Sequence, residues 1–154
     1  MNAEFVNPFI SGLLNVLETM AQTTLKPGKP KKKQTDIAKG DVSGLIGMVG
    51  PQVKGSLSIT FDENLALTLM ERMVGERPES VDAEVGDMVG EITNMICGNA
   101  KRELSEKGFD FGMATPMVVS GKQHTISHQV DGPKLIMPFH SDEGMAHLEI
   151  CFDK

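Results

Sequence analysis

The sequence predicts an α+β fold, with helices packed on a largely antiparallel sheet, from three observations. Two stretches, residues 8–20 and 81–107, repeat apolar side chains every three or four positions, as amphipathic helices do. Residues 42–50 and 53–61 are typical of consecutive strands, and the second alternates apolar and polar side chains. The last third of the chain contains short apolar segments separated by turn signals, as antiparallel strands are.

Length and composition favour one domain over residues 1–154, because a chain of this size can bury a sufficient core without disulfides or metals. The formal net charge of −6 argues against nucleic acid and anionic membranes as partners. No apolar run approaches the roughly 20 residues of a membrane span, and no signal peptide is evident. Cys97 and Cys151 lack metal or redox spacing, so we expect a cytoplasmic protein with free thiols.

The first helix is predicted to begin at Pro8, with Asn7 as its N-cap. Its apolar positions are Phe9, Ile10, Leu13, Val16, Leu17 and Met20. The basic run Lys26–Lys33 contains two prolines and a glycine, and this composition breaks the helical pattern. We expect a solvated loop or a protected sheet edge there, and a binding patch is the alternative.

Two strands, Val42–Gly50 and Val53–Phe61, are expected to meet at a Gly50-Pro51 turn. Asp62 is the expected cap of a short helix, Glu63–Val74, which ends at Gly75. Four further strands are predicted near the C-terminus: Met117–Ser120, Thr125–Val130, Lys134–His140 and Met145–Phe152.

The long helix, predicted over Val81–Lys107 and ended by Gly108, carries the unusual signal. Its core stripe is Val81, Val85, Met88, Val89, Ile92, Ile96, Ala100 and Leu104. Asp87, Glu91, Asn94 and Gly98 also follow one another at helical spacing, so they share the opposite face.

That second face breaks several local rules. Asp87 and Glu91 are like charges one turn apart, and Asn94 is a poor residue for the middle of a helix. Gly86, Gly90 and Gly98 add further cost. Such violations tend to gather at functional sites, but glycines that pack against a neighbouring element are an equal alternative.

The pattern Asp87-x-x-x-Glu91-x-x-Asn94, within DMVGEITNMICGNAK, resembles the signature helix of the CheC, CheX and FliY chemotaxis phosphatases. The segments NPFISGLLNVLETM, SGLIGMVG, VKGSLSITF and ATPMVVSGKQH resemble CheX in particular, so the likeness covers most of the chain and implies a CheC-like fold. Pro116 follows Asn94 one residue sooner than the signature proline does.

Other matches to the signature are set aside. Glu4 and Asn7 repeat the spacing, but we expect them at the N-cap before Pro8 and therefore off any helical face. The first helix otherwise has Asn15 and Glu18 in the reverse order. The chain therefore resembles a CheX-type member with one site.

The resemblance implies hydrolysis of the aspartyl phosphate of a CheY-type response regulator. Asn94 would orient the attacking water, and Glu91 would pair with a lysine of the regulator, while Asp87 and Gly98 would contact that partner. A homodimer formed through the sheets is also implied. The alternative is a non-catalytic module that docks on a response regulator or a flagellar switch component.

The resemblance places the required Mg²⁺ on the regulator, so this chain need not supply metal ligands. His124, His128, His140 and His147 fall on expected strands without the spacing of a metal motif. Cys97 has no basic activating residue nearby in the sequence, so we expect a buried, inert thiol.

Overall fold

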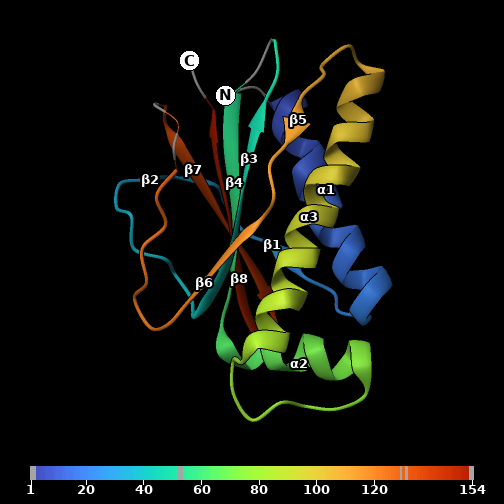
Figure 1. Cartoon of the computed structure of the whole chain (residues 1–154), viewed down its shortest axis with the longest axis vertical. Helices are drawn as coiled ribbons and strands as arrows, with labels where there is room; N and C mark the ends of the chain where they lie inside the picture. Colours follow the sequence, from blue (N-terminus) through green and yellow to red (C-terminus); the bar gives the residue numbers. More distant parts are fainter. Residues whose placement is uncertain (1–2, 52–53, 129, 131, 153–154) are drawn as a thin grey trace.

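A computed structural model describes residues 3–51, 54–128, 130 and 132–152, which form three helices and eight strands (Figure 1). The helices are α1 (Ala3–Ala21), α2 (Glu63–Val74) and α3 (Ala83–Glu106). The strands are β1 (Lys26–Pro27), β2 (Lys31–Lys33), β3 (Val42–Val49), β4 (Lys54–Phe61), β5 (Gly112–Met113), β6 (Met117–Ser120), β7 (Lys134–Ser141) and β8 (Gly144–Phe152).

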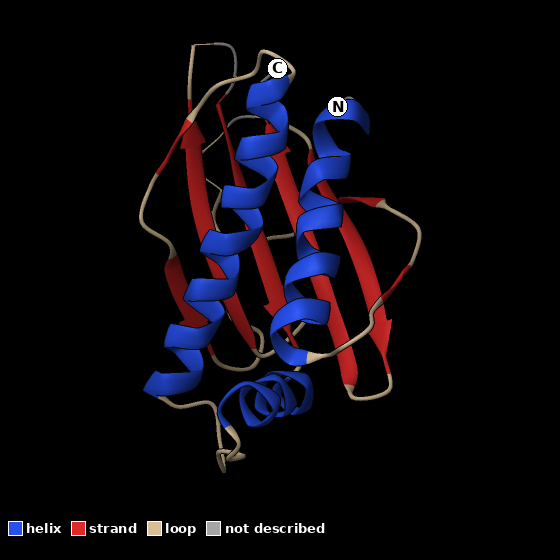
Figure 2. Ribbon diagram, turned by 90° about the vertical axis from the view of Figure 1, so that its right-hand side faces the viewer, coloured by secondary structure: helices blue, strands red, loops and turns tan. Residues whose placement is uncertain are grey.

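The strands form one antiparallel sheet in the order β1-β7-β8-β4-β3-β5, with β2 also paired to β7 and β6 to β3. Helices α1 and α3 lie along one face of this sheet, and α2 lies at one end (Figure 2). The predicted α+β class is therefore confirmed. None of the described helices is long and apolar enough to cross a membrane.

The core lies between the helices and the sheet, and it is built by the predicted stripes. The apolar positions of α3 from Val85 to Leu104 are buried, as are the inward residues Leu57, Ile59 and Phe61 of β4. A glycine allows the helices α1 and α3 to approach closely. A Cβ at Gly12 of α1 would lie 3.1 Å from the carbonyl oxygen of Ile96.

Helix α1 begins earlier than predicted, because Asn7 and Pro8 lie inside it. Proline lacks the N–H of one helical hydrogen bond, and this local signal predicted a start at Pro8. Aromatic side-chain packing stabilises the turn of α1 that precedes Pro8. The ring of Phe5 meets those of Phe109 and Phe152 edge-on, at centroid distances of 5.2 and 4.6 Å.

The basic run Lys26–Lys33 contains the short strands β1 and β2, which pair with the outer edge of β7. Of the two expectations for this run, the protected sheet edge is therefore confirmed. Lysine-rich edge strands of two or three residues offer little template for another chain.

The strand predicted over Thr125–Val130 is wrong for the described part of that segment. Only Thr125 forms an isolated bridge, with Ile37, and Gln129 lies outside the described residues. Around this bridge the Ile126 N–H donates to the carbonyl oxygen of Asp36 at 2.7 Å, and the His128 side chain hydrogen-bonds to Ser56 of β4. Val53, the expected first residue of a strand, also lies outside the described residues.

A buried polar layer covers part of the sheet face that the helices leave open. The Lys33 ammonium donates to the Glu149 carboxylate at 2.6 Å, and both side chains are buried. His128 contacts the other oxygen of the same carboxylate at 3.2 Å. Nearby, the Ser43 hydroxyl bonds to His124. These contacts tie two segments distant in sequence onto the sheet.

Helix α3 begins at Ala83, two residues later than predicted, because Asp82 caps it: its carboxylate accepts from the backbone N–H of Val85 at 2.9 Å. Asp62 occupies the N-cap position of α2, but its side chain accepts from the N–H of Met145 instead. The backbone N–H of Glu63, in the first turn of α2, donates to the Asp41 carboxylate at 2.8 Å.

Both cysteines are buried and unpaired with each other. Burial raises the pKa of the Cys97 thiol to about 12, so the thiolate is absent at neutral pH. The expected burial of the Cys97 thiol is confirmed.

Candidate functional site

Helix α3 positions the candidate residues by burying its other face. Val85, Val89 and Ile92 are fully buried, so residues half a turn away point outward from the sheet. Strand β6 pairs with β3 and runs beside this helix, as does the shorter β5 (Figure 1). The helix and this edge of the sheet therefore form two walls.

Between these walls lies an open groove of about 540 Å³. Asp87, Glu91 and Asn94 all line its helical wall, as their shared face predicted. The opposite wall consists of Met113, Ala114, Thr115, Pro116 and Val118. Gly98 lies one turn further along α3 and does not line the groove.

The three polar side chains of the helical wall are unengaged. Asp87 and Glu91 are exposed and Asn94 is half-buried. Within the part of the chain that the structure describes, none of these three side chains has a hydrogen-bond or ion-pair partner. Two uncompensated carboxylates one turn apart favour a cationic partner, and a free amide can both donate and accept.

The glycines of α3 fall into two groups. A Cβ at Gly86 or Gly90 would lie 3.6 or 3.4 Å from the methyl groups of Val118, so these two glycines border strand β6. A Cβ at Gly98 would meet nothing within 4 Å. The packing alternative therefore applies to Gly86 and Gly90, whereas the helix is open at Gly98.

Sequence reasoning missed Thr115, which lies on the groove wall opposite Asn94. Its neighbour Ala114 is fixed by an N–H donated to the carbonyl oxygen of Gly47 at 3.0 Å. Pro116, the signature proline, occupies the same wall. The available signal was the TP dipeptide, but only the pairing of β5 and β6 with β3 shows that it faces α3.

The reason for setting aside Glu4 and Asn7 is wrong. Both lie inside α1 and are exposed, so they do share a helical surface. They lie outside the groove that Glu91 and Asn94 line. Among the described residues, no group of three or more histidine, cysteine, aspartate or glutamate side chains is placed to hold a metal ion.

Comparison with known proteins gives consistent matches. The profile of the family described as chemotaxis phosphatase CheX matches residues 42–140, which include α3 and both groove walls. A relative from Thermotoga maritima, named CheY-P phosphatase CheX, is 27% identical over 79% of this chain and 79% of its own length.

Two solved structures extend the likeness to the whole fold. A CheC-like superfamily protein from Shewanella sp. PV-4 is 64% identical over 100% of both chains, with a TM-score of 0.94. A chain in the CheX–CheY–BeF3–Mg²⁺ complex from Borrelia burgdorferi is 29% identical, with a TM-score of 0.81. The similarity to that chain covers 97% of this chain and 98% of the other.

Proposed function

Because this chain belongs to the chemotaxis phosphatase CheX family, we propose that it hydrolyses the aspartyl phosphate of a CheY-type response regulator. The observation that carries the proposal is the groove in which Glu91 and Asn94 stand together without partners among the described residues. The name of the Thermotoga relative and the complex of the Borrelia relative with CheY support the choice of substrate.

Asn94 is proposed to orient the attacking water. In the reaction, water attacks phosphorus, the P–O bond to the regulator's aspartate breaks, and inorganic phosphate leaves. This step depends on positioning and charge stabilisation more than on covalent help. The Asn94 carboxamide is half-buried and free, and it adds no negative charge beside the anionic phosphoryl group.

Glu91 is proposed to fix the register of docking by pairing with a lysine of the regulator. Its carboxylate lies three residues before Asn94 on the same face of α3. A lysine of the regulator bound there would therefore fix where Asn94 enters the regulator's active site. Asp87, one turn earlier, extends the acidic surface. Gly98 leaves the helix open to a close approach at the other end.

The divalent metal of the reaction is proposed to belong to the regulator. Among the described residues that line the groove, the acidic side chains are Asp87 and Glu91, which stand on successive helical turns. Mg²⁺ prefers an octahedral set of oxygen ligands. In this proposal the chain supplies a water-positioning amide, and its partner supplies the metal and the phosphoryl group.

A phosphate-release assay tests the proposal. The chain is mixed with a phosphorylated CheY-type regulator and Mg²⁺, and the loss of phosphoryl groups is compared with the regulator's own rate. We expect acceleration that saturates with regulator concentration. Binding of the phosphorylated regulator without acceleration would show a non-catalytic docking module instead.

A further inference from the structure

A basic hollow of about 530 Å³ lies on the sheet face opposite α3, against β7, β8 and the segment 31–39. Its volume falls in the range of small-molecule sites. The floor is formed by Ile136, Pro138 and Met145, which are buried or half-buried. The catalytic groove is on the helical side of the sheet, so the two sites share no lining residue.

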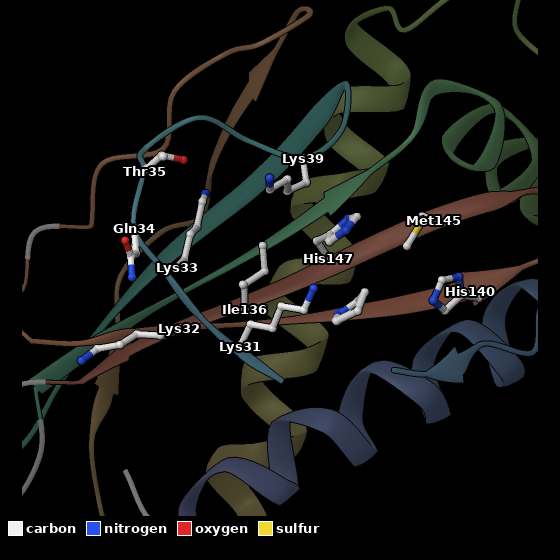
Figure 3. A pocket seen from close by; sticks show the side chains of 11 residues that line it. Lys31, Lys32, Lys33, Gln34, Thr35, Lys39, Ile136, His140, Met145 and His147 are labelled. Carbon is white, nitrogen blue, oxygen red and sulfur yellow. The ribbon is translucent and has the colours of Figure 1, made fainter. Parts of the chain in front are cut away.

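Two lysine side chains without ion-pair partners among the described residues border this floor. Figure 3 shows Lys31 extending toward His147 and Lys39 lying on the other side of that ring at the rim of the hollow, whereas Lys32 points away. Both Lys31 and Lys39 are exposed, and neither has an ion-pair partner among the described residues. Lys33 differs, because Glu149 neutralises it inside the buried polar layer. Two unpaired ammonium groups thus face one hollow in a chain of net charge −6.

The acids near the hollow do not cancel this charge. Glu149 is buried and paired with Lys33, and Asp62, which accepts from the backbone N–H of Met145, does not line the hollow. Burial lowers the pKa of His147, which disfavours a charge on its ring. The exposed His140 completes the lining. Lys31 and Lys39 are therefore the charges that an incoming anion meets.

From this arrangement we infer that the hollow binds a small organic phosphate, with its phosphate between Lys31 and Lys39 and its uncharged body on the apolar floor. Lysine ammonium groups bind phosphate oxygens as point charges. Among the described residues that line the hollow, the cationic side chains are lysines. This inference is independent of the proposed phosphatase activity.

Calorimetric titration of the full chain at low salt, without divalent cations, tests the inference. The probes are ADP and glucose 6-phosphate, with adenosine, glucose and inorganic phosphate as comparisons. We expect one organic phosphate to bind at a single site about tenfold more tightly than inorganic phosphate, since the floor holds its body. Adenosine and glucose should not bind.

Paired variants locate the site. Lys31→Ala/Lys39→Ala should weaken binding by about tenfold or more, because two charge-assisted contacts are lost. Lys101→Ala/Lys107→Ala removes the same charge from α3 and its C-cap and should change binding by less than about twofold. Thermal melts establish that all variants fold.

Several results would overturn the inference. Absence of binding by both organic phosphates, or equal weakening by the two double variants, would show that no such site exists. Binding of inorganic phosphate as tightly as the organic probes would leave the apolar floor without a role. Sedimentation with phosphatidylglycerol vesicles, without binding of soluble phosphates, would identify a membrane contact instead.

Discussion

Gly44 of β3 lies against Thr93 of α3 so closely that a Cβ at position 44 would stand 1.9 Å from the Thr93 hydroxyl oxygen. Thr93 is itself fixed, because its hydroxyl donates to the carbonyl oxygen of Val89 at 2.7 Å. Asn94 is the next residue of the helix. This contact therefore sets the height of the groove's helical wall above the sheet.

Gly44→Ala should destabilise the protein by roughly 1–3 kcal/mol, because the added methyl group forces α3 away from β3. The matched control is Gly98→Ala, which meets nothing within 4 Å and should raise stability by up to about 1 kcal/mol through helix propensity. Urea unfolding measures both. Equal stability of the two variants would contradict the tight contact.

Two neighbouring residues of α3 should separate scaffold from site. Ile92 is fully buried, so Ile92→Ala should cost about 2–5 kcal/mol of unfolding free energy. Glu91→Ala removes an exposed side chain and should leave unfolding nearly unchanged while weakening productive docking. Chemical denaturation and a binding titration provide the two readouts. If Glu91→Ala unfolds as readily as Ile92→Ala, the groove face is structural.

Asn94→Ala should abolish most phosphatase activity while stability stays unchanged or rises slightly, because alanine is the better helix former. The loss reflects water orientation, so binding of the phosphorylated regulator should largely survive. Asn94→Asp should also have low phosphatase activity, since the negative charge of its carboxylate would face the phosphoryl oxygens. Single-turnover dephosphorylation measures each variant. Wild-type turnover by Asn94→Ala would remove Asn94 from the mechanism.

Acid should weaken the buried polar layer through Glu149. Burial alone would raise the pKa of this carboxyl, but hydrogen bonds from His128 and Lys33 and their charge outweigh it and lower the pKa below its ordinary value. A carboxyl with a lowered folded pKa stabilises the fold above its ordinary pKa, and this stability is lost as pH falls through the lowered value. Unfolding free energy should therefore decline in acid.

Glu149→Gln should cost about 3–5 kcal/mol at neutral pH, because Lys33 is left buried without its counter-charge, and it should flatten the acid dependence. Glu143→Gln is the control, since its partly exposed pair with Arg72 at 3.6 Å should contribute less than about 1 kcal/mol. Denaturation between pH 3 and 7 compares the two, and identical pH profiles of Glu149→Gln and wild type would contradict this role.

We expect a homodimer that forms through the sheet, as the resemblance to CheX-like proteins implies. On the open sheet face, Met117 is 60% exposed beside the half-buried Leu45. Met117→Glu should therefore yield monomers, whereas Val74→Glu, at a position 59% exposed on α2, should not. Light scattering at micromolar concentration reports the mass. A monomeric wild type would contradict the expectation.

The sequence predicted the long helix and its two faces closely, because 24 residues of regular spacing leave little ambiguity. The sequence did not predict the second wall of the groove, which β5, β6 and the residues between them form. Thr115 lines the same groove as Asn94 only because β5 and β6 pair with β3, and that pairing joins segments about 70 residues apart. Strand order depends on tertiary packing, which local patterns do not encode.

Local signals failed where tertiary contacts were stronger. Pro8 predicted a helix start, yet aromatic packing of Phe5 extends α1 by a further turn. Residues 125–130 were predicted to form a strand, but the described part of that segment makes one isolated bridge, to Ile37, and the His128 side chain bonds to Ser56 across the sheet. In both cases a long-range contact outweighed a short pattern.

The position of β8 between β4 and β7 has a consequence for synthesis on the ribosome. Strand β4 is synthesised long before its partner β8, because Leu57 pairs with Ile150. Until residues 144–152 emerge, the nascent chain presents an apolar strand with an unpaired edge, which is open to aggregation. Chaperone dependence should therefore be greatest late in translation, and a ribosome stalled before Gly144 should display a protease-sensitive sheet.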